Sequence, residues 1–376
     1  MVEQKILKPD NNYVELDEYL EQTKVKTLLL VCDAAFNLLN ISEYFAHLED
    51  RMGIKVITFR EFQPNPSYES VVEGTKLFLQ TKCEMIVAIG GGSAIDVAKC
   101  IKLYSNMDSN INYLHQRIVP NDIKLLAMPT TAGTGSEATR YAVIYYEGIK
   151  QSVSDYSCIP EVVMMDASVL NTLPEYQRKS TMLDALCHAI ESYWSINSTE
   201  ESRGYARDAI RLILSNKDLY LMNESIGNEN MLKAANIAGR AINITQTTAG
   251  HAMCYKLTSI YGISHGHAAA ICLGKLWPYM LANTDKCIDP RGKNFLMNIF
   301  AEIETEISLK TFLNIVDSFE FKPIMNNGEE DIEILKNSVN TVRLKNNPIA
   351  LDSYAIEKLY RQIFAEDKEE IYNAGK

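Results

Sequence analysis

The sequence predicts an α/β domain with a parallel sheet in its N-terminal part, followed by an all-α C-terminal domain. Short apolar runs rich in strand-forming residues alternate with helical patterns in the first 174 residues, at 25–33, 54–62, 85–91 and 123–129. Such alternation favours a parallel sheet covered by helices on both faces. Beyond this region, apolar residues recur at three- and four-residue intervals, a pattern typical of helices. Because 376 residues suit two domains, we expect one over 1–174 and another over 175–376.

The composition indicates a folded chain whose main partner is neither nucleic acid nor a membrane. Apolar residues make up 47% and charged residues 23%, within the range of globular proteins, so disorder is excluded. A formal net charge of -11 disfavours a phosphate backbone, which requires a basic face. We find no apolar run of roughly 18 residues and no basic N-terminal start leading into an apolar run. We therefore expect a cytoplasmic protein.

The eight cysteines are scattered, contain no C-x-x-C pair and mostly have apolar neighbours. This distribution is typical of reduced thiols in a core rather than of a disulfide framework. Cys187 and Cys254 lie beside or near histidines. Cysteines in such surroundings are more often small core residues than metal ligands.

A glycine loop follows the run at 85–91, where "MIVAIGGGSAIDVAK" passes from a strand into a helix. Gly91 and Gly92 would let backbone N–H groups and the positive end of the helix approach a phosphate. The alternative is a tight turn in which Ser93 is the N-cap and Asp96 completes a capping box. The loop lacks the G-x-G-x-x-G fingerprint, so both interpretations stay open.

Two further features at strand ends favour a nucleotide. A polar stretch, "MPTTAGTGSEATR" at 128–140, follows the run at 123–127, and ligands of open parallel sheets bind at the carboxyl edge. Asp33 ends another strand, where a carboxylate can hold a ribose hydroxyl and repel a 2′-phosphate. An ordinary loop or N-cap aspartate is the alternative for Asp33.

Four residues of the helical part have the chemistry of a metal site. Asp184 and His188 are four residues apart and would share one helix face, although such a pair is more often a surface hydrogen bond. With His251 and His265 they would form an N₃O ligand set with open positions, suited to Fe²⁺ or Zn²⁺ rather than Ca²⁺ or Mg²⁺. His267 lies two residues from His265, which favours a supporting or substrate-contact role.

These motifs together resemble the iron-dependent (group III) alcohol dehydrogenase family, from Asp33 to the "NNP" at 346–348. The resemblance rests on "PNP", "GGGSAIDVAK", "TTAGTGSEAT", "DALCHAIE", "GHAM" and "HGHA". It implies a dinucleotide domain, a helical domain, and a cleft that holds NAD(P) and a divalent metal, usually iron. It also implies four metal ligands, separated by 4, 63 and 14 residues: Asp184, His188, His251 and His265.

The resemblance also implies the dinucleotide contacts and the chemistry. Asp33 matches the acid that favours NAD over NADP, and the other matching positions are Asn65, Gly91, Gly92, Ser93, Thr130, Thr131 and Lys150. In such a site a metal polarises a carbonyl oxygen while the nicotinamide delivers a hydride to the carbonyl carbon.

The chain departs from the family at a position one turn after the third ligand, where many members carry a histidine that is a candidate proton carrier. Tyr255 stands there, and a phenol with an ordinary pKa near 10 is a poorer proton shuttle at neutral pH. We therefore place Tyr255 and His267 at the catalytic positions, with His267 or bound water as the substitute proton carrier.

Two cations in segments that line the family's cleft suggest a negatively charged substrate. Arg140 follows "GTGSEAT" and Lys256 follows Tyr255, and guanidinium pairs well with phosphonate or carboxylate. The alternative is a structural salt bridge for Arg140 and a solvated helix face for Lys256.

The stretches at 135–145 and 250–273 are similar to the phosphonoacetaldehyde reductase branch of the family. They predict reduction of phosphonoacetaldehyde to 2-hydroxyethylphosphonate with NAD(H) and Fe²⁺, or Zn²⁺ in its place. Succinic semialdehyde, or a neutral aldehyde of the lactaldehyde or butanol type, is the alternative substrate. We also expect a homo-oligomer, specifically a dimer.

Overall fold

The computed structural model describes residues 4–10, 12–321 and 327–373, with side chains described as far as Phe364 in the last helix. The chain divides into two compact units. The first consists of Met1–Leu173 and Asp218–Gly239, and the second of Pro174–Lys217 and Arg240–Lys376.

The first unit is built on a six-stranded sheet in which every strand pair is parallel, as the alternating pattern predicts. The strands follow the spatial order β1-β8-β5-β4-β2-β3. Their bounds are β1 Lys5–Leu7, β2 Thr27–Cys32, β3 Lys55–Phe59, β4 Met85–Gly90, β5 Lys124–Pro129 and β8 Val162–Met164. The four predicted apolar runs become β2, β3, β4 and β5, and β4 is buried along its whole length.

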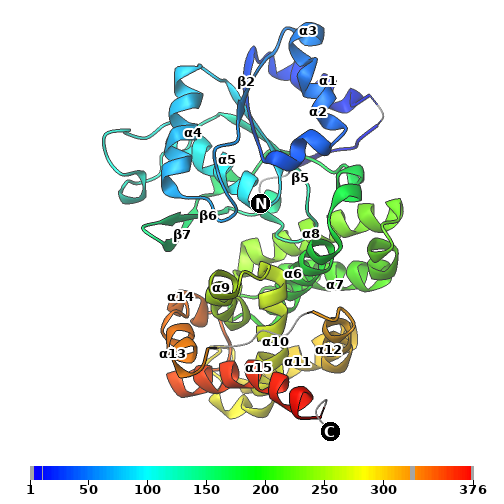
Figure 1. Cartoon of the computed structure of the whole chain (residues 1–376), viewed down its shortest axis with the longest axis vertical. Coiled ribbons are helices and arrows are strands. Elements are labelled where there is room, and N and C mark those ends of the chain that lie inside the picture. The colour runs from blue at the N-terminus through cyan, green and yellow to red at the C-terminus, as the bar shows by residue number, and fades with distance from the viewer. Residues whose placement is uncertain (1–3, 11, 322–326, 374–376) are drawn as a thin grey trace. The chain divides into compact units, whose positions relative to one another are not determined.

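Helices lie on both sides of this sheet (Figure 1). The longer ones are α1 (Val14–Thr23), α4 (Tyr68–Gln80) and α5 (Gly92–Tyr104), and the short α2 (Ile41–Ala46) and α3 (Leu48–Met52) follow β2. Packing on the α4 and α5 side is tight: a Cβ on Gly74 would come within 2.6 Å of Ile101 and 2.8 Å of Phe59. A side chain at 74 would therefore require the Ile101 and Phe59 side chains, or the helix itself, to shift.

The order in which strands are added to the sheet reverses at β2. β3 follows β2 on one side, whereas β4, the next strand, pairs with β2 on the other side. Such a switch point leaves a crevice at the carboxyl ends of the two strands, where ligands of open α/β sheets bind. Asp33 and the glycine loop at 90–93 directly follow these two strand ends.

A hairpin that the sequence analysis did not predict joins β6 (Tyr141–Tyr146) to β7 (Ile149–Ser154). Its two turn residues, Glu147 and Gly148, have φ values of 51° and 74°. Positive φ at both positions defines the type I′ turn, whose twist matches that of the paired strands.

Beyond the expected boundary between 174 and 175, residues 218–239 group with the first unit. This segment contains the end of α7 (Glu200–Leu221) and most of α8 (Ser225–Thr245). Gly239 packs on Gly135 so closely that a Cβ on Gly135 would lie 2.6 Å from the Gly239 Cα. Asn236 also donates to the buried Glu137 carboxylate at 3.1 Å. These contacts tie α8 to the 128–140 loop.

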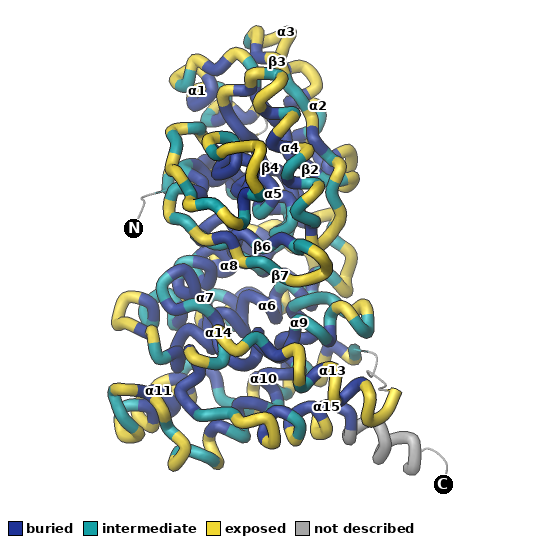
Figure 2. Tube along the Cα trace, turned by 90° about the vertical axis from the view of Figure 1, so that its left-hand side faces the viewer, coloured by how far each residue is buried: buried dark blue, intermediate teal, exposed yellow. Residues whose placement is uncertain are grey.

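The described part of the second unit is helical, as predicted. Its further helices are α6 Glu175–Trp194, α9 Ala249–Tyr261, α10 His265–Ala282, α11 Lys293–Glu306, α12 Leu309–Asp317, α13 Glu329–Asn337, α14 Thr341–Leu344 and α15 Ser353–Asn373. Buried residues predominate in α6 and α10, which pack on each other (Figure 2). Among the described helices, we find none with the length and apolar character needed to cross a membrane.

Candidate functional site

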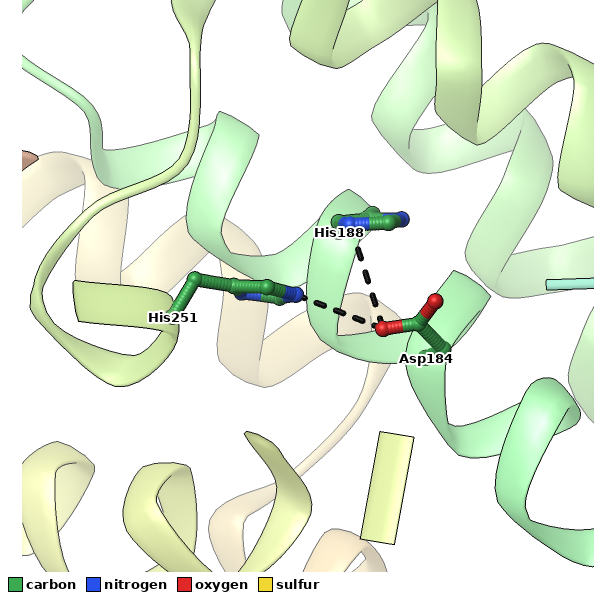
Figure 3. Close-up of side chains that lie close together, drawn as sticks. All are labelled: Asp184, His188 and His251. Carbon is green, nitrogen blue, oxygen red and sulfur yellow. Dashed lines mark hydrogen bonds and ion pairs between the residues drawn. The ribbon is translucent and has the colours of Figure 1, made fainter. Parts of the chain in front are cut away.

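Four potential metal ligands from three helices converge in the second unit. The Nε2 atoms of the three histidines lie 3.9 Å, 3.4 Å and 4.0 Å from one oxygen of Asp184, for His188, His251 and His265 in turn. Figure 3 shows the first two imidazoles directed at this carboxylate. Two ligands about 2.1 Å from a tetrahedral metal lie roughly 3.4 Å apart, so the observed separations fit a cluster that can close on one ion.

The electrostatics of this cluster also suit a cation. Asp184, His188 and His251 are buried, and their ligand atoms lie within 4.8 Å of one another. Burial would raise the pKa of Asp184, but His188, His251 and His265 outweigh it and hold that pKa well below its ordinary value. The carboxylate therefore stays ionised, which is the form that binds metal.

Glu191 is a functional candidate that the sequence analysis missed. It is completely buried on α6, and one carboxylate oxygen accepts hydrogen bonds from the Thr248 hydroxyl at 2.5 Å and the Gly250 N–H at 2.9 Å. Its other oxygen contacts Nδ1 of His251. A histidine that donates Nδ1–H to a carboxylate presents Nε2 to a metal, so Glu191 orients His251 toward Asp184.

A sequence signal for Glu191 exists. It follows His188 by three residues and Asp184 by seven, so all three lie on one face of α6. The pattern D-x-x-x-H-x-x-E therefore contains the carboxylate that orients His251, a histidine outside the pattern.

His265, at the start of α10, forms the open side of the cluster, since its side chain is 36% exposed. The Tyr255 ring stacks on the His265 ring, with centroids 5.4 Å apart and an interplanar angle of 13°. The sulfur of Cys254 lies 3.6 Å from Nδ1 of His265. Lys256 follows on α9 and is partly buried.

His267 belongs to a neighbouring cluster. Its Nδ1 atom lies 3.0 Å from the Tyr176 hydroxyl, its backbone N–H donates to the Ser180 hydroxyl, and its ring packs on Phe321. Because Tyr176 accepts the Ser264 N–H at 2.9 Å, its own O–H can donate to Nδ1. Burial lowers the pKa of His267 to about 4, so the imidazole is neutral at pH 7.

The two glycine loops of the first unit contact each other at the switch point. The Thr130 N–H donates to the Gly90 carbonyl at 3.0 Å, and a Cβ on Gly91 would lie 3.4 Å from Thr131. A Cβ on Gly92 would lie 3.0 Å from Thr134. A Cβ at 92 would therefore crowd Thr134, whereas a Cβ at 91 would make only an ordinary contact with Thr131.

The capping-box interpretation of this loop is wrong. Gly91 is the N-cap of α5 and makes no side-chain cap, while the Ser93 hydroxyl accepts the Asn65 N–H at 3.4 Å. The Asp96 carboxylate accepts from the Ser136 hydroxyl at 2.6 Å and the Val143 N–H at 2.9 Å, so it binds the second loop and strand β6 instead of its own helix.

Lys99 is a second residue that the sequence analysis missed. It is completely buried, and its ammonium donates to the carbonyls of Ser136, Thr139 and Tyr141 at 2.5 Å, 2.8 Å and 2.7 Å. A buried ammonium needs such acceptors, and three carbonyls of one loop supply them. Lys99 therefore fixes the 136–141 backbone to α5.

The remaining predicted dinucleotide residues lie around these loops. Asp33 caps the short helix that follows β2 by accepting the Ala35 N–H at 2.9 Å, and its other oxygen would lie 3.4 Å from a Cβ on Gly90. Asn65 has a φ of 60°, a conformation that asparagine tolerates. Lys150, on β7, together with Lys99 opposes the rise that burial causes in the pKa of Asp96.

The guanidinium of Arg140 is held between two aromatic rings. It lies 4.8 Å from the Tyr141 centroid and 4.7 Å from the Tyr156 centroid, and it donates to the Tyr156 hydroxyl at 2.5 Å. Stacking and hydrogen bonding restrict a side chain that otherwise has many rotamers.

Comparison with solved structures supports the architecture. The chain superposes on an iron-containing alcohol dehydrogenase from Thermococcus thioreducens with a TM-score of 0.85 at 20% identity, covering 97% of this chain and 99% of that one. It also matches a sulfoacetaldehyde reductase from Bifidobacterium kashiwanohense, solved with NAD⁺, with a TM-score of 0.81 at 24% identity, covering 97% and 98% of the two chains. These similarities confirm the predicted fold class.

Relatives identified by sequence similarity are also alcohol dehydrogenases. The chain is 30% identical to the NAD-dependent methanol dehydrogenase of Bacillus methanolicus, covering 89% of this chain and 91% of that protein. It is also 30% identical to the aldehyde-alcohol dehydrogenase of Streptococcus pneumoniae over 73% of its own length, but it spans only 33% of that longer protein.

Two family descriptions cover most of the chain. Residues 4–167 match "Iron-containing alcohol dehydrogenase", and residues 179–364 match "Fe-containing alcohol dehydrogenase family, C-terminal". The chain therefore belongs to the iron-containing alcohol dehydrogenase family of oxidoreductases.

Proposed function

We propose that this protein is a metal-dependent, NAD(H)-linked reductase of a small anionic aldehyde, with phosphonoacetaldehyde as the preferred substrate. The observation that carries the proposal is the convergence of three imidazole Nε2 atoms on one oxygen of Asp184. Nitrogen-rich sites with one carboxylate suit Fe²⁺ and also Zn²⁺. When bound, the metal would supply Lewis-acid polarisation of a carbonyl, and NADH would supply the hydride.

The residues of the second unit would hold and orient the reacting groups. Asp184, His188, His251 and His265 are the proposed metal ligands, and Glu191 keeps the Nε2 atom of His251 available. Tyr255 stacks on His265 and so limits the rotation of that ring. Tyr176 can donate to Nδ1 of His267, and the ring proton is then on Nε2. The Nε2–H group is therefore the one that can donate a hydrogen bond or a proton.

The residues of the first unit would bind the dinucleotide. Helix α5 starts with three residues whose backbone N–H groups can donate to a pyrophosphate: Gly91, Gly92 and Ser93. The positive end of the helix also favours this anion. Asp33, at the end of β2, would accept from a ribose hydroxyl and repel a 2′-phosphate, which favours NAD(H) over NADP(H). The other proposed dinucleotide contacts are Asn65, Thr130, Thr131 and Lys150.

Arg140 and Lys256 are the proposed partners of the substrate anion. The contacts of Arg140 with Tyr141 and Tyr156 support this role, because a guanidinium that is already oriented loses less entropy when it binds an oxyanion. A neutral short-chain alcohol is the second candidate substrate, since one relative is named a methanol dehydrogenase.

Steady-state kinetics test the proposal. Iron-loaded protein would be assayed anaerobically for NADH oxidation with phosphonoacetaldehyde, succinic semialdehyde, lactaldehyde and butyraldehyde. We expect the highest kcat/KM with phosphonoacetaldehyde. Arg140→Ala should lower that value about 10- to 100-fold, as expected for loss of a charge-assisted hydrogen bond, while the value for butyraldehyde changes less than about 3-fold.

Arg140→Lys and Tyr156→Phe are the matched controls, because the first keeps the charge and the second removes only the phenol that Arg140 contacts. Both should retain the preference for the phosphonate. The anionic-substrate proposal fails if butyraldehyde is the best substrate and Arg140→Ala leaves the order of substrates unchanged.

A further inference from the structure

Cys254 contacts two of the proposed metal ligands from within α9. It is completely buried, three residues after His251. Its S–H donates to the His251 carbonyl at 3.4 Å, and its sulfur lies 3.6 Å from Nδ1 of His265. The thiol therefore connects the backbone of one histidine to the ring of another.

The position of the Cys254 sulfur between the His251 carbonyl and Nδ1 of His265 favours one tautomer of His265. The thiol has one hydrogen and the His251 carbonyl can only accept it, so a thiol that donates to this carbonyl offers its sulfur lone pairs to the Nδ1–H of His265. With the proton on Nδ1, Nε2 carries the lone pair and lies 4.0 Å from an oxygen of Asp184. Glu191 does the same for His251 with a carboxylate.

We propose that Cys254 is a positioning residue of the metal site, which accepts the Nδ1–H of His265 and thereby presents Nε2 to the metal. The proposal rests on the metal site proposed above. Cys254 selects the tautomer of His265, whereas the stacked ring of Tyr255 fixes the plane in which that imidazole lies. His265 needs both, because its side chain is 36% exposed and packing alone does not define its orientation.

Cys272 provides a matched control. It is also completely buried and lies on α10, the helix that begins with His265. Cys272→Ala removes the same atoms from the interior as Cys254→Ala, and within the described contacts of Cys272 we find no hydrogen bond to a histidine. A difference between the two variants in metal affinity therefore reports on the contact with His265 rather than on lost packing.

The test is a Co²⁺ titration of metal-free protein in competition with a chromophoric chelator. Cys254→Ala should weaken Co²⁺ binding about 10- to 100-fold, the usual effect of losing a group that orients a metal-binding histidine. Cys254→Ser, which keeps a hydrogen-bond acceptor, should stay within about 3-fold of the unchanged protein, and Cys272→Ala within about 2-fold. Both alanine variants should lose similar thermal stability when metal-free.

Two results overturn the proposal: equal Co²⁺ affinities for Cys254→Ala and Cys272→Ala, or a loss in Cys254→Ser as large as in Cys254→Ala. Failure of the metal site itself has a different signature. In that case the unchanged protein and His251→Ala would bind Co²⁺ equally weakly.

Discussion

Replacing Glu191 by glutamine tests how the buried carboxylate controls the metal site. Glu191 accepts from the Thr248 hydroxyl and the Gly250 N–H with one oxygen and contacts Nδ1 of His251 with the other. Glutamine has one carbonyl oxygen and one NH₂ group. If the oxygen keeps the hydrogen bonds at the start of α9, the NH₂ group faces Nδ1, and two N–H donors cannot share that contact.

The structure indicates how the conflict is resolved. The proton of His251 must move to Nε2, so that Nδ1 can accept from the amide, and Nε2–H then points at Asp184, 3.4 Å away. The lone pair needed for a metal is lost. We expect metal affinity to fall about 10- to 100-fold, which corresponds to ~1.4–2.7 kcal/mol.

The metal-free protein should lose stability as well. Glutamine retains one acceptor for the start of α9, but it removes the buried negative charge that pairs with His251. Glu191 and Asp184 outweigh burial and raise the pKa of His251 to about 10, so the free energy of unfolding should fall by about 3–5 kcal/mol, as for a buried ion pair that loses one partner. A fall of 1 kcal/mol lowers the Tm of a domain of this size by about 2–4 °C. Glu304→Gln, on the exposed side of α11, is the control for loss of one negative charge.

The assay is Co²⁺ affinity by chelator competition, together with thermal unfolding of the metal-free proteins. Unchanged Co²⁺ affinity in Glu191→Gln, with or without a lower Tm, would refute the assignment of Glu191 as the residue that orients His251.

Three further predictions concern other parts of the site. His265→Ala should abolish measurable Co²⁺ binding and turnover while NADH fluorescence titration still shows binding, and retained turnover would exclude His265 as a ligand. Lys99→Met leaves three buried carbonyls without a donor, so urea unfolding should show a free energy of unfolding lower by about 2–4 kcal/mol. The KM for NADH should also rise. An unchanged KM would show that Lys99 only stabilises the loop. Asp33→Gly should raise kcat/KM with NADPH about 10-fold or more relative to NADH, as expected from removing like-charge repulsion at the 2′ position, and an unchanged ratio would exclude Asp33 as the selective residue.

The parts of the fold that are coded locally could be predicted from the sequence. Strands β2, β3, β4 and β5 are apolar runs flanked by polar residues, and the helices of the second unit have regular apolar spacing. Strands β1 and β8 have only three residues each, and β1 is a strand because it pairs with β8 at the edge of the sheet. That pairing joins segments far apart in the chain, and no local pattern records it.

The assignment of 218–239 to the first unit also depends on distant contacts. The segment looks like any other amphipathic helix, and what ties it to the first unit is the close approach of Gly239 to Gly135 and the hydrogen bond from Asn236 to Glu137. A glycine in a helix and a glutamate in a polar loop are both common, so neither residue identifies its partner in advance.

The candidate metal site could be predicted only in part, because some of its contacts also depend on the tertiary structure. Asp184 and His188 share a helix face by their spacing, while His251 and His265 were identified by the scarcity of histidine and by the family resemblance. Glu191 and Lys99 were missed because a charged residue in a helix usually faces solvent, and only the tertiary structure buries them.

The most direct test of the account is the position of the metal itself. Crystals of the protein grown with Zn²⁺ would be measured at the zinc absorption edge, where anomalous scattering locates the ion. We predict a single strong peak at about 2.0–2.2 Å from an oxygen of Asp184 and from Nε2 of His188, His251 and His265. A peak bound by other residues, or no peak near Asp184, would contradict the account.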